Sequence, residues 1–219
     1  MGAGGVPPHL VEAEITARDA SNARTRLKTA VFPVIKTLDE FDRTVSTINP
    51  ATLDYLASLE WIAARENLAL VGPAGTGKSH LLVALGVAAV TAGHRVRYFT
   101  AAELVETLYR ALADNSVGRT IETLLRNDLI IVDELGFAPL DDTGAQLLSR
   151  FIAAAYERRA LGIASHWPFE SWGRFLPEHT TAVSLLDRLL HHCHTVITNG
   201  DSYRMRQART RGGTATKTS

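Results

Sequence analysis

The sequence has little of what marks secreted or membrane proteins. Its 219 residues include one cysteine, Cys193, so no disulfide can form within the chain and a reducing compartment is favoured. No apolar run approaches the roughly 20 residues that a membrane-spanning helix needs. The first residues lack the basic start and apolar block of a secretory signal, and Val6 stands where a myristoylation motif has Ser or Thr. We therefore expect a cytoplasmic protein with no membrane contact.

Net charge is also lacking. Lys and Arg total 23, as do Asp and Glu, so the formal charge is zero. Overall charge therefore gives no argument for nucleic-acid binding, and any such surface must come from local clusters of basic side chains. Apolar residues make up 46% of the chain, which is ordinary for a globular domain that buries a substantial core.

Short apolar runs alternate with segments of helical periodicity along most of the chain. This alternation predicts an α/β fold in which a five-stranded parallel sheet is covered by helices on both faces, giving three layers. The expected strands are 68–72, 96–100, 129–133, 161–165 and 195–198. The expected helices are 11–29, one starting at Asn49-Pro50, 78–91, 101–113, 118–126, 142–159 and 180–192.

Composition divides the chain into four parts. Residues 1–10 are rich in Gly and Pro and are expected to be disordered. A helical segment and linker follow at 11–48, and the main domain occupies 49–204. Residues 205–219 form a basic tail, also expected to be disordered, that ends in Gly, Thr and Ser.

A phosphate-binding loop lies between the first expected strand of the main domain and the helix after it. The motif G-x-x-x-x-G-K-[ST] is matched in full by Gly72-Pro73-Ala74-Gly75-Thr76-Gly77-Lys78-Ser79. Glycines let backbone N–H groups surround a phosphate, and the helix directs the positive end of its dipole at the same anion. Lys78 is expected to reach the β- and γ-phosphates, and the Ser79 hydroxyl to bind Mg²⁺. A chance glycine-rich turn is the alternative, and the flanking strand and helix argue against it.

The expected strand at 129–133 ends in two carboxylates. Ligands gather at the carboxyl ends of strands in a parallel sheet, which places Asp133 beside Ser79 as a ligand for magnesium or its water shell. Glu134 is then positioned to orient or deprotonate a water that attacks the γ-phosphate. The alternative is a strand that merely ends in an acidic turn. The pair favours hydrolysis over phosphoryl transfer to a small substrate.

Several segments in a fixed order resemble the IstB-type transposition helper ATPases, which are AAA+ proteins close to the DnaC helicase loaders. Within residues 11–207 they are KTLDEFD at 36–42, PAGTGKSH at 73–80, VDELGF at 132–137, YER at 156–158, FESW at 169–172, LDRLLHH at 186–192 and GDSYR at 200–204. The resemblance implies a P-loop NTPase core of the AAA+ type, with a short helical segment before it. It also implies ATP as ligand, ATP-dependent assembly on DNA as a homo-oligomer, and help to a partner transposase in choosing target DNA.

The resemblance also assigns roles to single residues. His80 is counted with the nucleotide-binding residues of the loop. Arg188 corresponds to an arginine finger that reaches the ATP of a neighbouring subunit, and a surface arginine paired with Asp187 is the alternative. Arg204 either contacts phosphates from its own chain or is a surface arginine. Leu38 and Phe41 are candidates for contacting adenine.

The chain departs from the family in two places. The family usually has Thr-Ser-Asn after the fourth strand, with Asn touching the γ-phosphate and the attacking water, whereas this chain has Ala164-Ser165-His166. His166 can still donate a hydrogen bond, with a charge that depends on pH, and a loop histidine that covers Trp167 is the alternative. The family also usually carries a longer helical region upstream. We expect both departures to affect hydrolysis or partner docking.

Two other regions carry chemistry that we interpret conservatively. The insertion at 101–127 lies along DNA in the relatives, but its arginines are mixed with acidic residues, so a solvated helical face is the alternative. In the run His191-His192-Cys193-His194, consecutive residues of a helix point in different directions, and no second ligand pair has finger-like spacing. We interpret that run as the packed end of a helix rather than a metal site.

Three functions remain open at this stage. The first is a DNA-associated oligomeric ATPase that assists a transposase. The second is a helicase loader with the same site chemistry. The third is a nucleotide-dependent DNA-binding switch with negligible turnover, which His166 and the short start motivate.

Overall fold

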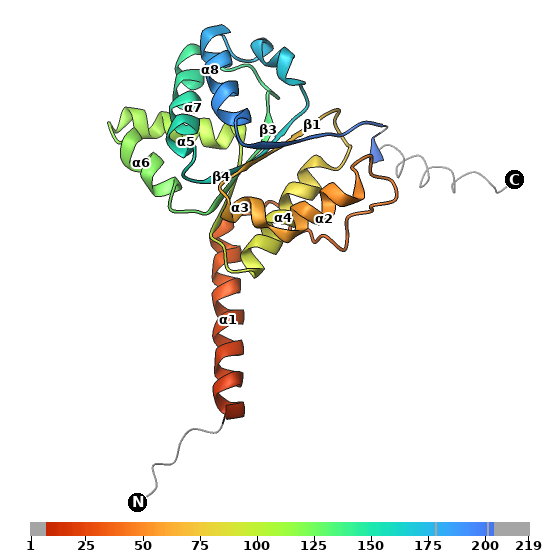
Figure 1. Ribbon diagram of the computed structural model, residues 1–219. Coiled ribbons are helices and arrows are strands. Elements are labelled where there is room, and N and C mark those ends of the chain that lie inside the picture. Colours follow the sequence, from red (N-terminus) through yellow and green to blue (C-terminus); the bar gives the residue numbers. More distant parts are fainter. Residues whose placement is uncertain (1–7, 178, 201, 204–219) are drawn as a thin grey trace, which may run out of the picture.

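Five parallel strands form the centre of the structure, a computed structural model that describes residues 8–177, 179–200 and 202–203 (Figure 1). They lie in the order β2-β3-β4-β1-β5, and every neighbouring pair is parallel. Their bounds are Asn67–Val71 for β1, Val96–Thr100 for β2, Leu129–Leu135 for β3, Ala160–Ser165 for β4 and Cys193–Ile197 for β5. The segments that follow β1, β4 and β3 therefore lie side by side at one edge of the sheet, which we call the carboxyl edge.

Helices cover both faces of the sheet (Figure 1). One face carries α2 (Pro50–Ser58), α3 (Glu60–Ala63) and α4 (Lys78–Thr91), and the other carries α5 (Ala101–Ala113), α6 (Val117–Leu124), α7 (Asp142–Ala155), α8 (His179–Leu190) and the 3₁₀ helix η1 (Phe169–Arg174). Strand β3 shows why two cores form, because side chains alternate along a strand. Leu129 and Ile131 belong to the core under α4, and Ile130 and Val132 to the core under α5 and α7. The predicted three-layer fold is confirmed.

Helix α1 (Pro8–Ala30) projects from the α/β unit in Figure 1. Its last turn is tied to the domain, because Ala30 is fully buried and the Arg97 guanidinium donates a hydrogen bond to the Thr29 carbonyl at 2.9 Å. The helix begins at Pro8, so residues 8–10 are helical rather than part of a disordered start. Residues 1–7 and the tail at 205–219 lie outside the described residues. None of the described helices is both long and apolar enough to span a membrane.

Local sequence signals set two helix starts. The Asn49 side chain accepts a hydrogen bond from the Ala51 N–H at 2.9 Å, and Pro50 occupies the first turn of α2, as the Asn-Pro pair predicts. Helix α5 begins with a capping box, in which Thr100 and Glu103 each accept a hydrogen bond from the other's backbone N–H. The second cap holds the start of α5 directly at the end of β2.

Helix C-termini differ from the sequence-based expectation. Helix α7 ends at Ala155 instead of 159, because Tyr156 leaves the helical conformation (ψ 126°) and Glu157 follows in a left-handed one (φ 56°). Helix α8 ends at Leu190 instead of 192. The predicted helix after Asn49 is divided by Leu59, also left-handed at φ 62°. The 3₁₀ helix η1 was not predicted.

Candidate functional site

The glycine-rich loop connects β1 to α4 at the carboxyl edge. Gly72 and Gly75 have φ of 148° and 83°, where L side chains are strained. A Cβ on Gly72 would lie 2.0 Å from the Thr198 carbonyl oxygen, because the segment after β5 crosses the loop there. A Cβ on Gly75 would lie 2.2 Å from Ser202 Oγ. Glycine is therefore required at both positions by space as well as by backbone conformation.

Lys78 begins α4 and is buried, with its ammonium directed into the loop. Its Nζ donates hydrogen bonds of 2.7 Å to the carbonyl oxygens of Gly72 and of Pro73. Gly77, the residue before α4, has no side chain to cap the N–H groups of the first turn. A buried cation beside an uncapped helix N-terminus is an environment that favours an anion. Ser79 follows as the second residue of this helix.

Asp133 is buried and held by two hydrogen bonds. Tyr98 of β2 donates its hydroxyl to Asp133 Oδ2 at 2.9 Å, and the Glu134 N–H donates to Oδ1 at 2.8 Å. Burial first, and the Asp133 charge second, raise the pKa of Tyr98 above its usual value, so its hydroxyl stays a donor at neutral pH. The carboxylate is thus fixed in position at the end of β3.

Glu134 lies at an irregularity in the sheet. The pairing of β3 with β4 shifts between Val132 and Leu135, and Glu134 has φ 59°. Such a bulge redirects a side chain, and here Glu134 is exposed while Asp133, one residue earlier, is buried. The two adjacent carboxylates therefore have different environments, as different roles require.

His166 follows β4, the strand that lies between β1 and β3. Partial burial, and then the charge of Lys78, lower the pKa of His166 below 6.5. The imidazole is therefore neutral at pH 7 and has one N–H to donate. The Gly72 N–H donates a hydrogen bond to the carbonyl of Ser165 at 3.1 Å, so His166, the next residue, begins its segment beside the phosphate-binding loop. Asp133 and Glu134 lie in the last residues of β3, and Lys78 and His166 lie in the segments after β1 and β4, so the four residues predicted from the sequence all lie at the carboxyl edge.

The two predicted arginines have different outcomes. Arg188 lies in the last turn of α8, where its guanidinium donates to the carbonyl and hydroxyl of Ser184. This helix ends just before β5 begins, at the amino edge of the sheet, whereas the loop follows the other end of β1. The two edges are separated by the length of β1, about 13 Å for four residue steps. Arg188 therefore does not join the site of its own chain. Arg204 lies outside the described residues, although the preceding Tyr203 donates its N–H to the Gly75 carbonyl at 3.0 Å.

Phe41 and His80 lie together beside the loop. Their ring centroids are 5.6 Å apart, and a Cβ on Gly77 would lie 3.2 Å from the Phe41 ring. His80 Nε2 is buried and has no hydrogen-bond partner among the described residues. Leu38 accepts a hydrogen bond from the Phe41 N–H at 3.2 Å and packs on the same core. An apolar wall with one unsatisfied ring nitrogen therefore flanks the loop.

Sequence reasoning missed Tyr98 as a site residue, because its contact with Asp133 depends on the pairing of β2 with β3.

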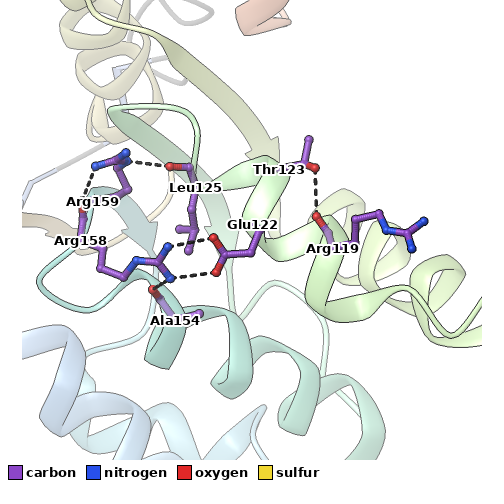
Figure 2. Close-up of polar contacts among 7 residues, drawn as sticks. All are labelled: Arg119, Glu122, Thr123, Leu125, Ala154, Arg158 and Arg159. Carbon is purple, nitrogen blue, oxygen red and sulfur yellow. Dashed lines mark hydrogen bonds and ion pairs between the residues drawn. The ribbon is translucent and has the colours of Figure 1, made fainter.

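The insertion formed by α5 and α6 carries a mixed set of charges (Figure 2). Glu122 of α6 accepts two hydrogen bonds of 2.9 Å from Arg158, which ties α6 to the end of α7. Arg110 is paired with Glu106 within α5. The Arg119 guanidinium points away from the Glu122 pair in Figure 2. Arg110 and Arg158 are therefore paired with glutamates, whereas the Arg119 side chain points away from the Glu122 pair.

The parallel sheet and the glycine-rich loop define the chain as a protein of the P-loop α/β class. Its core is similar to the crystal structure of DnaI, with a TM-score of 0.62 and 16% identity over 75% of this chain and 91% of that one. It is also similar to that of the DnaC helicase loader, with a TM-score of 0.53 and 20% identity over 68% and 87%. These likenesses show the fold.

Sequence comparison identifies the family. The sequence pattern of the family described as IstB-like ATP binding protein matches residues 6–211. A protein of Pseudomonas aeruginosa, named for ATP binding in insertion sequence IS21, is 37% identical over 203 residues, which are 92% of this chain and 77% of that protein. The chain belongs to the IstB-like ATP-binding protein family, and the predicted resemblance is confirmed.

Proposed function

We propose that this protein hydrolyses ATP and that it works in oligomers on DNA to assist a transposase in target selection. The single observation that carries the ATPase proposal is the meeting at one sheet edge of the Lys78 loop and a buried, doubly bonded Asp133. A relative encoded in an insertion sequence supports the link to transposition.

The donor groups fit ATP with Mg²⁺. Lys78 would exchange the loop carbonyls that it now contacts for phosphate oxygens, while the backbone N–H groups at the start of α4 hold the same anion. The Ser79 hydroxyl and the Asp133 carboxylate are oxygen ligands of the kind that Mg²⁺ prefers. When bound, Mg²⁺ would neutralise phosphate charge.

Glu134 and His166 would have different roles toward the attacking water. The exposed Glu134 carboxylate would accept the water's proton through an oxygen. The neutral ring of His166 would donate its N–H to a phosphate or water oxygen, in place of the family's Asn. A neutral imidazole has one N–H donor in a rigid ring, so the position of this donor differs from that of the side-chain amide of Asn. We therefore expect hydrolysis to be slow without further activation.

A neighbouring subunit would supply that activation. Arg188 lies at the amino edge, remote from its own loop, and can serve as an arginine finger only for the nucleotide of another chain. Its contacts with Ser184 hold the guanidinium against α8 in the single chain. Hydrolysis should therefore depend on protein concentration.

DNA contact is proposed for the insertion of α5 and α6. Arg119 points away from the paired Glu122, as expected for a group that meets a phosphate backbone (Figure 2). With few unpaired arginines on these helices, we expect weak contact that falls steeply as salt rises.

The proposal is tested by phosphate release with duplex DNA, comparing the wild type with Arg188→Ala and Lys78→Ala. Each variant alone should lose most activity, Lys78→Ala through nucleotide binding and Arg188→Ala through the finger. A mixture should recover part of it, because a Lys78→Ala subunit still offers Arg188 to an intact neighbouring site. Arg43→Ala, which removes an exposed ion pair with Asp54, is the matched control. Unchanged DNA-stimulated hydrolysis in Arg188→Ala would refute the assembly.

Two other functions keep a specific observation in their favour. Likeness to the DnaC helicase loader fold favours a loader, and capture of a replicative helicase instead of a transposase would support it. His166 favours a binding switch with little turnover. If ATP drives assembly on DNA equally well in the wild type and in Glu134→Gln, and phosphate release is negligible in both, the switch is correct.

A further inference from the structure

The run 191–194 separates into three environments in the structure. Burial raises the pKa of the Cys193 thiol to about 11, so this side chain is no thiolate at neutral pH. His194 Nε2 lies 2.6 Å from a carboxylate oxygen of Glu66, to which the Tyr55 hydroxyl also donates at 3.1 Å. Cys193 is therefore a protonated thiol and His194 is paired with Glu66, so His191 and His192 are the two residues of this run that can bind a further ligand.

His191 and His192 do not lie in the helix that the sequence predicted for them. Consecutive residues point apart on a helix, but α8 ends at Leu190, so His191 and His192 lie in the turn before β5. Their ring centroids are 4.2 Å apart. The turn therefore brings two imidazoles to the same side of the chain.

A third ligand comes from a distant turn. Glu157, held in the left-handed conformation between α7 and β4, places Oε1 3.7 Å from His192 Nε2. One ligand atom from each of Glu157, His191 and His192 lies within 4.8 Å of the other two, and all three side chains are exposed. An open pocket of about 430 Å³ borders Glu157 and His192 and gives ions access to them.

Neighbouring groups orient these ligands. The Tyr156 hydroxyl oxygen lies 2.8 Å from His191 Nδ1, and this contact fixes the orientation of the imidazole. The Arg65 guanidinium donates to the Glu157 carbonyl at 3.4 Å and steadies the turn that carries the carboxylate. Such outer contacts are what ligating histidines and their loops usually have.

We propose that Glu157, His191 and His192 form a binding site for a divalent transition-metal ion of the zinc class. Two imidazole nitrogens and one carboxylate oxygen are a donor set that Zn²⁺ accepts, with a fourth position left for water. Ligands bound tetrahedrally at about 2.1 Å lie about 3.4 Å apart. The present separations exceed this by at most about 1.4 Å, which rotation of exposed side chains can close. Mg²⁺ is disfavoured here because it prefers oxygen ligands.

This site is separate from the nucleotide site. Glu157 precedes β4 and the two histidines precede β5, so the ion would lie at the amino edge of the sheet. It would join the turn after α7 to the turn after α8, across the start of β1. Because the two turns are far apart in the chain, bound metal should stabilise the folded state against the unfolded one.

The test is calorimetric titration of ZnCl₂ into the full-length, untagged, nucleotide-free protein with Mg²⁺ present. We expect one Zn²⁺ per chain and an increase in Tm on binding. His192→Gln and Glu157→Gln should each weaken binding by at least the 10- to 100-fold that loss of an outer partner costs, and Tyr156→Phe by less than either. His94→Gln, which alters a histidine outside the cluster, should bind as the wild type does.

Nucleotide binding by each variant reports whether it has folded, independently of the metal. The proposal is overturned if the wild type takes up no stoichiometric Zn²⁺. It is equally overturned if folded His192→Gln and Glu157→Gln bind as tightly as the wild type, or if His94→Gln abolishes binding.

Discussion

Replacing Tyr98 with Phe tests how Asp133 is held. The substitution keeps the ring in its buried position in β2 and removes only the hydroxyl that donates to Asp133 Oδ2 at 2.9 Å. Asp133 is 3% exposed, so water cannot replace the lost donor without rearrangement. The remaining contact is the Glu134 N–H on Oδ1.

The cost can be worked out from these contacts. A hydrogen bond to a buried charged group contributes about 1.5–3 kcal/mol, so the free energy of unfolding should fall by about 2 kcal/mol. For a chain of this size, that corresponds to a Tm lower by about 4–8 °C. If Asp133 holds Mg²⁺ or its water shell, loss of its orienting partner should also weaken Mg²⁺-dependent ATP binding by about 10- to 100-fold.

The assay measures the affinity for a fluorescent ATP analogue with Mg²⁺ and with EDTA. Urea unfolding and thermal unfolding of the same variants give the free energy of unfolding and the Tm. Only the affinity with Mg²⁺ should fall in Tyr98→Phe. Tyr109→Phe is a matched control, because its hydroxyl also donates to an aspartate, Asp141, but at an exposed site. The reasoning is refuted if Tyr98→Phe lowers the Tm while Mg²⁺-dependent affinity stays at the wild-type value.

Three further variants probe the site and the fold. In the free protein the pKa of His166 lies below 6.5, and the charge of bound phosphate should raise it, so ATP binding near pH 6 should be accompanied by uptake of a proton. Calorimetry in buffers of different ionisation enthalpy measures this uptake, which should be absent in His166→Asn. Gly75→Ala sets a Cβ against Ser202 at a strained φ and should weaken ATP binding about tenfold, whereas Gly173→Ala, with nothing within 4 Å, should not. Asn67→Ala leaves a buried carbonyl and a buried N–H unpaired and should lower the free energy of unfolding by about 2–4 kcal/mol in urea.

Much of the candidate site could be predicted because its chemistry is local in the chain. The loop ending in Lys78 and Ser79 is eight consecutive residues between an apolar strand and a helix. Asp133 and Glu134 come at the end of an apolar run, and the rule that parallel strands share a carboxyl edge brings them to the loop without knowledge of the strand order. His166 came instead from the family resemblance, as the residue that stands where the family has Asn after the fourth strand.

Contacts that depend on strand register could not be predicted. Tyr98 reaches Asp133 because β2 pairs with β3 so that Thr100 lies opposite Asp133. Nothing in the sequence near Tyr98 distinguishes it from a core tyrosine, since its partner lies 35 residues away. The same applies to Thr198, whose approach to Gly72 depends on β5 lying beside β1.

The end of α8 shows how a small boundary error changes a functional inference. Leu189 and Leu190 continue the apolar pattern, and no Gly or Pro marks a stop before 192. The stop comes from β1 instead: the Asn67 side chain donates to the Leu189 carbonyl at 2.9 Å, and its backbone N–H to the His192 carbonyl at 2.7 Å. A residue more than 120 positions earlier thus acts as the cap of this helix. Because tertiary contact overrides local propensity here, His191 and His192 leave the helix and can face Glu157.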